Sequence, residues 1–307
     1  MKAASAPPDC FKSVIISASR RTDIPAFYAE WFINRIRAGF CTVPNPVNPH
    51  RISNVSLDPN DVDVIVFWTR DPKPLIKRLA ELDRRGFRYY FQYTILANPR
   101  TIDPKSPPTQ RSIETLRSLA DQIGPDRVIW RYDPIIITNQ SPSHRHLEKI
   151  SYIASALRGY TKRLVISLLD TYHHTEGRMR SLEKKGLRVS FLDGERFPCF
   201  IKSIVEIAKA NRMEIFSCAE ESGLDRLGVA SGKCIDDRLI EKVFKIMVTH
   251  KKDPHQRPAC GCVMSKDIGM YDTCPFHCVY CYATKNIVSV KRNLLKHDPK
   301  SPSLISR

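Results

Sequence analysis

Six short apolar runs alternate with six stretches of helical spacing along most of this chain, and that alternation restricts the fold more than any other feature. The apolar runs are typical of strands that are covered on both faces of a parallel sheet. The predicted strands span residues 13–19, 63–69, 88–95, 127–133, 163–170 and 214–220. The predicted helices span residues 26–38, 73–85, 110–123, 143–158, 197–211 and 236–248. No glycine-rich phosphate-binding motif follows any of the strands, so the pattern favours an α/β fold, a partial (β/α)6 TIM-like barrel of parallel strands, over a dinucleotide-binding sheet.

Composition divides the chain into four parts. We expect a loose leader over 1–11, the partial barrel over 12–250, a cysteine-rich iron–sulfur segment packed on the barrel over 251–290, and a basic tail over 291–307. The leader lacks the apolar centre of a secretion signal, and no apolar run reaches the length of a membrane span, so we expect a cytoplasmic protein without a membrane partner. In that reducing compartment, clustered cysteines indicate metal ligands rather than disulfides.

The cysteine-rich segment contains Cys274, Cys278 and Cys281 in the spacing C-x3-C-x2-C. A loop of this length can bring three thiolates onto three irons of one [4Fe–4S] cluster, which leaves the fourth iron free to bind another molecule. Thiolates are soft ligands that also suit zinc, and His277 between the cysteines leaves a zinc site open as an alternative. We expect an iron–sulfur cluster at this loop.

The loop, with Tyr280 and Tyr282 on either side of its last cysteine, resembles the cluster loop of radical S-adenosylmethionine enzymes. The resemblance implies that S-adenosylmethionine chelates the open iron through its amino and carboxylate groups, and that one electron then splits the sulfonium to a 5′-deoxyadenosyl radical. It also implies that the two tyrosines pack near the adenine and that a ferredoxin or flavodoxin supplies the electron. In those enzymes the cluster loop follows the first strand of a (β/α)6 barrel, whereas here it comes near the end of the chain.

The chain as a whole is similar to an uncharacterised bacterial family, domain of unknown function 1848. The similarity runs from residues 17–25 through 67–72 and 130–134 to the cysteine loop, so it covers nearly the whole sequence. Because that family is uncharacterised, this second resemblance implies no particular reaction.

Charged side chains stand at the ends of several predicted strands, where the loops of a barrel converge on an active site. The residues that we expect to be catalytic are Arg20, Arg21, Asp23, Arg131, Asp133 and Glu220. Charges beside buried strands are costly unless they are paired or solvated, so a wet, charged cavity would account for them together. Its arginines would bind carboxylate or phosphate groups. Alternatively, Arg20 with Asp23 and Arg131 with Asp133 are structural ion pairs.

Four other cysteines lie at or after the end of the sixth predicted strand. They are Cys218, Cys234, Cys260 and Cys262. These residues could hold a second cluster, and Gly261 would let the backbone fold tightly enough for both flanking sulfurs to reach one metal assembly. Alternatively, one of them donates a fourth ligand to the cluster at the loop, which would close that cluster to a substrate.

The formal net charge of +17 favours an anionic partner. Together with the resemblance of the cysteine loop, this charge implies a radical S-adenosylmethionine-type enzyme that acts on an anionic small molecule, a nucleotide or a nucleic acid. Two alternatives stay open: a non-radical iron–sulfur protein that transfers electrons or binds a polyanion, and a zinc-stabilised nucleic-acid binder. The basic tail is expected to be a frayed, solvated terminus.

Overall fold

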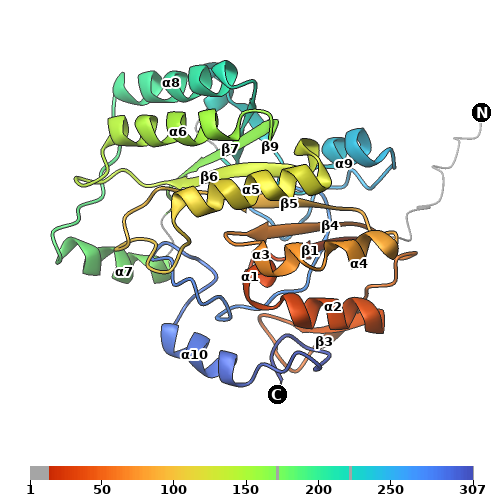
Figure 1. Cartoon of the computed structure of the whole chain (residues 1–307). Helices are drawn as coiled ribbons and strands as arrows, with labels where there is room; N and C mark the ends of the chain where they lie inside the picture. The colour runs from red at the N-terminus through yellow and green to blue at the C-terminus, as the bar shows by residue number, and fades with distance from the viewer. Residues whose placement is uncertain (1–13, 171–172, 221–222, 307) are drawn as a thin grey trace, which may run out of the picture.

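The computed structural model describes residues 14–170, 173–220 and 223–306, so the predicted leader lies outside the described residues. Its main sheet has eight parallel strands in the order β10-β1-β4-β5-β6-β7-β8-β9 (Figure 1). In that order they span Lys266–Asp267, Val14–Ala18, Val62–Thr69, Tyr89–Thr94, Val128–Ile135, Arg163–Leu168, Glu214–Cys218 and Ala230–Gly232. All six predicted strands are present and lie side by side in sequence order. The TIM-like barrel is not confirmed, because no pairing among the described residues joins β9 to β10 and the sheet is therefore open.

The long helices that connect the strands between β1 and β8 pack on one face of this sheet. Sequential parallel strands are joined by crossovers of a single hand, which places the connecting helices on the same side. Figure 1 shows α5, α6 and α8 in front of the strands. The helices are α1 (Ile24–Phe27), α2 (Ala29–Ala38), α3 (Lys73–Ile76), α4 (Leu79–Arg84), α5 (Thr109–Ile123), α6 (Ser143–Leu157), α7 (His173–Glu183), α8 (Arg196–Ala210), α9 (Asp237–Phe244) and α10 (Ile287–Leu295). None of the described helices has the length and apolar character needed to cross a membrane.

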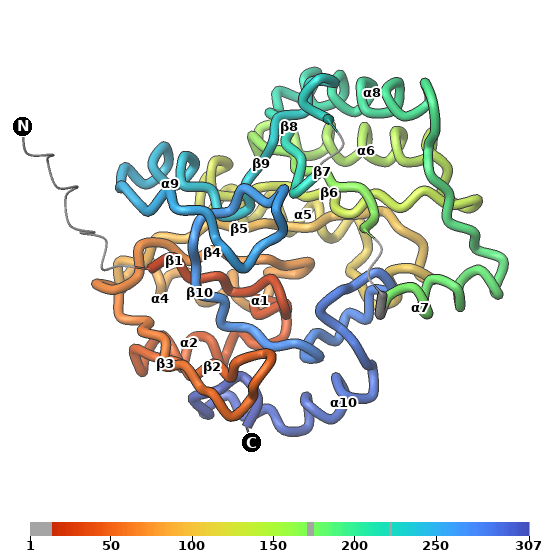
Figure 2. The backbone as a smooth tube through the Cα atoms, turned by 180° about the vertical axis from the view of Figure 1, so that it is seen from behind, coloured from red at the N-terminus to blue at the C-terminus, as the bar shows by residue number. Residues whose placement is uncertain are grey.

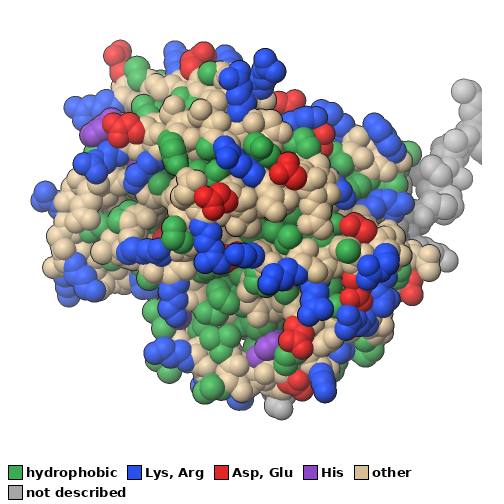
Figure 3. Space-filling model, in the orientation of Figure 1, with side chains coloured by type: hydrophobic (Ala, Val, Ile, Leu, Met, Phe, Trp, Pro, Cys, Tyr) green, Lys and Arg blue, Asp and Glu red, His purple; other side chains and the backbone are tan. Residues whose placement is uncertain are grey.

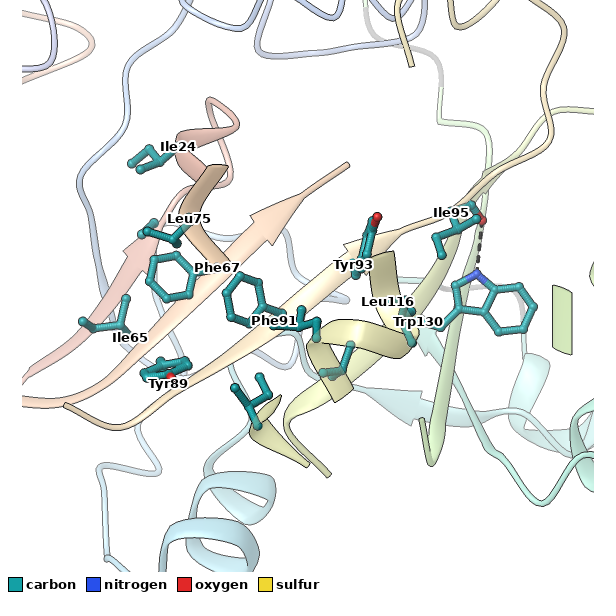
Figure 4. Close-up of a cluster of buried hydrophobic side chains, with 14 of the residues drawn as sticks. Ile24, Ile65, Phe67, Leu75, Tyr89, Phe91, Tyr93, Ile95, Leu116 and Trp130 are labelled. Carbon is teal, nitrogen blue, oxygen red and sulfur yellow. Dashed lines mark hydrogen bonds between the residues drawn. The ribbon is translucent and has the colours of Figure 1, made fainter. Parts of the chain in front are cut away.

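Large aromatic side chains fill the space between the sheet and these helices. Phe67 of β4 stacks on Phe91 of β5 with ring centroids 4.8 Å apart (Figure 4). The buried Trp130 indole N–H donates a hydrogen bond to the Ile95 carbonyl at 3.1 Å, which satisfies its one polar atom. Successive strand residues point to opposite faces of the sheet, so the residues between these aromatics face the other way.

That other face is covered by the C-terminal part of the chain. Strand residues such as Ile15, Val64 and Tyr90 pack against residues from 234–263, the segment that contains α9. Figure 2 shows this segment lying across the back of the sheet. Burial on both faces explains the near-continuous apolar strands. It also brings the cysteines of this segment into the core.

Several elements were not predicted from periodicity. The hairpin of β2 (Phe40–Pro44) and β3 (Ile52–Ser56) encloses the proline-rich loop, and α7 lies in a stretch that is too polar to show a helical pattern. The predicted helix at 26–38 is divided into α1 and α2, and the one at 73–85 into α3 and α4. The missed strands β9 and β10 have only a few residues each, which is too short for a periodic signal.

The prediction of a frayed basic tail is wrong. After α10 the chain packs on α2, where the Trp31 indole donates to the Ser301 carbonyl at 3.0 Å and Arg35 Nη2 donates to the Lys300 carbonyl at 2.8 Å. Leu304 is 1% exposed. The basic side chains of this segment are solvated, but its carbonyl groups satisfy donors on α2, and composition does not reveal that second role.

A buried histidine gives the fold a predictable response to acid. On α6, His146 donates from Nε2 to the Ile136 carbonyl at 3.0 Å and accepts at Nδ1 from the Tyr132 hydroxyl at 2.9 Å. Burial lowers the pKa of His146 from 6.5 to about 4. The unfolded chain therefore takes up this proton first, and the stability present above pH 6.5 is lost as the pH falls toward 4, by on the order of 2–3 kcal/mol.

Urea denaturation of the wild type and of His146→Gln across this pH range measures that loss. The difference in unfolding free energy between the two proteins should shrink as the pH falls. Parallel pH profiles for the two proteins would contradict the prediction.

Candidate metal and cofactor site

β10 lies at the edge of the sheet beside β1, and this pairing positions the cysteine loop. Ile16 and Ser17 pair in parallel with Lys266 and Asp267. Because parallel strands point the same way, the loops after β10 and after β1 both start at the carboxyl ends of the strands. The Asp267 carboxylate fixes this junction, since it accepts hydrogen bonds from the Ser17 hydroxyl at 2.6 Å and from the Ser19 hydroxyl at 2.7 Å.

Gly269 permits the close approach of the two segments. A Cβ added at Gly269 would lie 2.0 Å from the Ser19 Oγ. We expect Gly269→Ala to lower the free energy of unfolding by about 1–3 kcal/mol, because one of the two segments must shift. Gly177→Ala on α7 is the control, since a Cβ there meets nothing within 4 Å and alanine suits a helix. Urea denaturation measures both variants, and equal stability would mean that the segments do not pack this closely.

The loop itself is tied to the chain that follows β1. The Tyr28 hydroxyl donates to the Thr273 carbonyl at 2.6 Å. At the other end of the loop, the Tyr282 hydroxyl donates to the Arg20 carbonyl at 2.7 Å. Both ends of the cysteine loop are therefore held beside the carboxyl end of β1.

The three thiols of the loop are close enough to affect one another's pKa values. Burial raises the pKa of Cys274 to about 12, and it raises the pKa of Cys278 well above the ordinary value, with a contribution from Cys281 in both cases. The backbone N–H groups of Asp23 and Phe276 donate hydrogen bonds to the Cys274 sulfur. Hydrogen bonds to sulfur tune iron–sulfur clusters, and thiols with raised pKa values must release their protons when a metal binds.

Two guanidinium groups lie beside these thiols. Arg70, which follows β4, has its Nη1 3.3 Å from Asp103 Oδ1. The Tyr280 hydroxyl donates to the same carboxylate at 3.0 Å and also contacts Arg70. From α7, Arg178 Nη2 donates to the Cys281 carbonyl at 2.6 Å. These cations would offset the negative charge of bound thiolates.

The chemistry of this donor set fits an iron–sulfur cluster. One short loop supplies three sulfur ligands, with N–H donors and cations around them. Within the described ranges, no three His, Cys, Asp or Glu side chains are placed to hold one metal ion as they stand. His277 adopts a φ of 60°, and its buried Nδ1 has no hydrogen-bond partner among the described residues.

The predicted catalytic residues after β1 take part mainly in structural contacts. Arg21 Nε lies 3.0 Å from Asp267 Oδ1. Asp23 caps α1 by accepting the Ala26 N–H at 3.0 Å, and it also accepts the Arg70 N–H at 2.6 Å. Burial raises the pKa of Asp23 to about 7. Asp23 and Arg21 therefore join the ends of β1, β4 and β10.

The other predicted catalytic residues lie at neighbouring strand ends. Arg131 and Asp133 of β6 form the predicted ion pair, and the Ser167 hydroxyl of β7 contacts the same carboxylate. Glu220, just after β8, accepts the Leu168 N–H at 2.9 Å, and burial raises its pKa. The structure thus brings these acidic groups to the carboxyl ends of neighbouring strands. A substrate cavity there stays a prediction.

The second set of cysteines also comes together, on the face of the sheet that residues 234–263 cover. The Cys218 and Cys234 sulfurs are 3.3 Å apart. The Cys262 sulfur accepts the Cys234 N–H at 3.3 Å and the N–H of the following residue at 3.4 Å. Hydrogen bonds from the Cys234 and Cys260 thiols lower the pKa of Cys262, and a hydrogen bond from Cys234 lowers the pKa of Cys218.

Sequence reasoning missed the residues that hold both cysteine groups in place. These are Asp103, Arg178, Asp253 and Asp267. Each is a single charged residue in a loop, a polar helix or a very short strand, and only its tertiary partner distinguishes it from a solvated charge.

The fold and the two cysteine groups define a class: an α/β protein with one open parallel sheet and clustered thiols at its carboxyl edge and on one face. Residues 15–283 match the family described as Domain of unknown function (DUF1848), and the chain belongs to that family. The matched region includes both cysteine groups. No curated protein matches the chain, and no solved structure does.

Proposed function

We propose that this protein is an iron–sulfur enzyme of the radical S-adenosylmethionine type, with Cys274, Cys278 and Cys281 as the ligands of a [4Fe–4S] cluster. One observation carries the proposal. The strand before the cysteine loop is β10, and β10 occupies the edge position beside β1. In spatial order, the loop therefore follows the first of the strands, which is where the loop that it resembles stands in the radical enzymes. The loop comes late in the sequence because β10 is the last strand along the chain, although it lies at the edge of the sheet.

The order of the strands also supports a partial barrel. The six adjacent strands from β10 to β7 are parallel, and the helices that connect them lie on one face. We propose that they correspond to a partial (β/α)6 barrel whose inner face is filled by residues 234–263. Active sites of such barrels form at the carboxyl ends of the strands.

When bound, the cluster would supply the one electron that cleaves the C5′–S bond of S-adenosylmethionine, giving methionine and a 5′-deoxyadenosyl radical that would take a hydrogen atom from the substrate. An external donor of the ferredoxin or flavodoxin kind would provide this electron. The residues of the chain position and shield this chemistry. Arg70 and Asp103 hold Tyr280, and the Arg20 carbonyl holds Tyr282, so both aromatic rings have fixed places beside the ligands. Asp133 and Glu220 are the acidic groups that we propose to face the substrate.

The substrate class follows from charge. The chain carries a net charge of +17. Figure 3 shows Lys and Arg side chains spread over the face of the molecule that carries α5 and α8, with fewer acidic side chains between them. Such a surface attracts polyanions and raises their rate of encounter. We propose an anionic substrate, either a small molecule, a nucleotide or a nucleic acid.

Reductive cleavage of S-adenosylmethionine tests the proposal. The anaerobically reconstituted protein is mixed with S-adenosylmethionine and a low-potential one-electron reductant, and 5′-deoxyadenosine is measured by chromatography. The wild type should form it, and Cys281→Ala should not. A protein with a full complement of iron and sulfide that forms no 5′-deoxyadenosine would favour the non-radical electron-transfer reading. Zinc in place of iron and sulfide would favour the nucleic-acid binder.

A further inference from the structure

We propose that Cys218, Cys234, Cys260 and Cys262 form a second metal site, separate from the cysteine loop. Its four thiolates would hold a soft metal centre, either one zinc ion or one iron–sulfur cluster. Both are bound by sulfur alone in many proteins. The site would not depend on S-adenosylmethionine or on the cluster at the loop.

The four cysteines of the proposed site converge in the folded chain. They come from three separate segments: the end of β8, the turn before α9, and the stretch before β10. A buried thiol on its own behaves as a small apolar side chain, as Cys41 does in the other core of the molecule. Here the Cys218 and Cys234 sulfurs are 3.3 Å apart, and the Cys262 sulfur accepts hydrogen bonds from the Cys234 and Cys260 thiols. Packing alone gives no reason to gather four sulfurs.

Backbone N–H donors converge on the Cys262 sulfur. Its sulfur accepts two consecutive backbone N–H groups, from Cys234 at 3.3 Å and from Ile235 at 3.4 Å. Backbone N–H groups that converge on a sulfur stabilise a thiolate, which is the form that binds metals. The turn that supplies these donors also supplies one of the proposed ligands.

Positively charged side chains lie beside the four cysteines. Arg131 is 4% exposed, and its Nη1 donates to the Cys234 sulfur at 2.9 Å. Arg20 stacks over the Trp68 ring at 5.3 Å, and its buried Nη2 has no hydrogen-bond partner among the described residues. Four thiolates around a divalent metal carry about two negative charges. Arg20 can offset part of that charge, while Arg131 also pairs with Asp133. The Arg20 Nη1 lies 3.8 Å from Asp253 Oδ2, which is a long distance for an ion pair.

Metal binding requires a small rearrangement. The sulfurs follow one another as a hydrogen-bonded chain, and in the described part of the protein no three possible ligands surround a common point. At least one thiol must therefore change rotamer and lose the proton that it now shares with a neighbour. Side-chain rotation of this kind leaves the backbone in place.

Metal analysis of the full chain tests this site without reference to activity. The triple variant Cys274→Ser/Cys278→Ser/Cys281→Ser removes the loop ligands, and it is purified without oxygen from cells supplied with iron and zinc. It should retain either about one zinc per chain or about four irons with about four sulfides. Adding Cys234→Ser and Cys262→Ser to it should remove that metal. Cys41→Ala is the matched control, because it deletes a buried thiol outside the proposed site.

The identity of the retained metal distinguishes the two occupants, and either one supports the site. A folded triple variant that holds neither metal overturns the proposal. If the triple variant does not fold, X-ray absorption of the wild type decides instead. A zinc shell of about four sulfurs, or twice the iron of one cluster, supports the site, whereas iron for a single cluster without zinc overturns it. A failure of the radical proposal would leave these results unchanged.

Discussion

Replacing Cys278 with alanine is expected to abolish the cleavage of S-adenosylmethionine and to remove about four irons per chain. The loop offers three sulfur ligands, so a variant with two cannot hold the cluster against competing thiols in solution. Loss of a residue that only supports a metal ligand typically lowers metal affinity or activity about 10–100-fold. Loss of a ligand itself should therefore reduce 5′-deoxyadenosine formation by more than about 100-fold. Iron and sulfide content and product formation measure the effect.

Cys199→Ala is the control for this variant, because Cys199 is an exposed thiol on α8, far from the loop in the sequence. It should keep wild-type iron and activity. A Cys278→Ala protein that retains its iron and forms product at the wild-type rate would show that the loop does not ligate the cluster.

Replacing Arg70 with methionine is expected to destabilise the protein by about 3–5 kcal/mol, because it leaves a buried carboxylate without its cation. Asp103 is 3% exposed, and Arg70 Nη1 lies 3.3 Å from it. The arginine also donates to the Ser106 hydroxyl at 2.6 Å and contacts the Tyr280 hydroxyl. Urea denaturation of the metal-free protein measures the loss.

Two further variants separate charge from packing. Arg70→Met/Asp103→Asn should be more stable than Arg70→Met alone, because the amide leaves no buried charge. Arg37→Met is the matched control, since Arg37 forms a forked ion pair with Glu81, at 2.8 and 2.7 Å, on the surface, and it should change stability little. An Arg70→Met protein as stable as Arg37→Met would mean that the pair near the loop is solvated.

The main strands could be predicted because each is buried on both faces. The run at 63–69 is apolar at almost every position, since Phe67 faces the helices while Val66 faces the C-terminal segment. β10 could not be predicted, because two residues give no periodicity and its edge position depends on the carboxylate of Asp267 meeting Ser17 and Ser19. The closure of the barrel could not be judged either, because strand count and helix spacing do not say whether the two edge strands meet.

Some residues of the candidate site could be predicted from the sequence, and others could not. The spacing of Cys274, Cys278 and Cys281 is a local signal, so the sequence alone identifies them as a set. The meeting of Cys218 with Cys234 and Cys262 depends on how residues 234–263 lie on the sheet, so the sequence could only suggest it. Charged residues at strand ends were easy to find, but their partners were not.

Electron paramagnetic resonance of the reduced, reconstituted protein, recorded without oxygen and with or without S-adenosylmethionine, shows whether the loop cluster has an open iron that binds S-adenosylmethionine. Chelation of an open iron changes the electronic structure of the cluster, so the account predicts a reduced [4Fe–4S] signal that shifts when S-adenosylmethionine is added and that is absent from Cys278→Ala. The variant also removes ambiguity about a second cluster, whose signal would persist in it and would not respond. A loop cluster whose signal is the same with and without S-adenosylmethionine would contradict the radical mechanism.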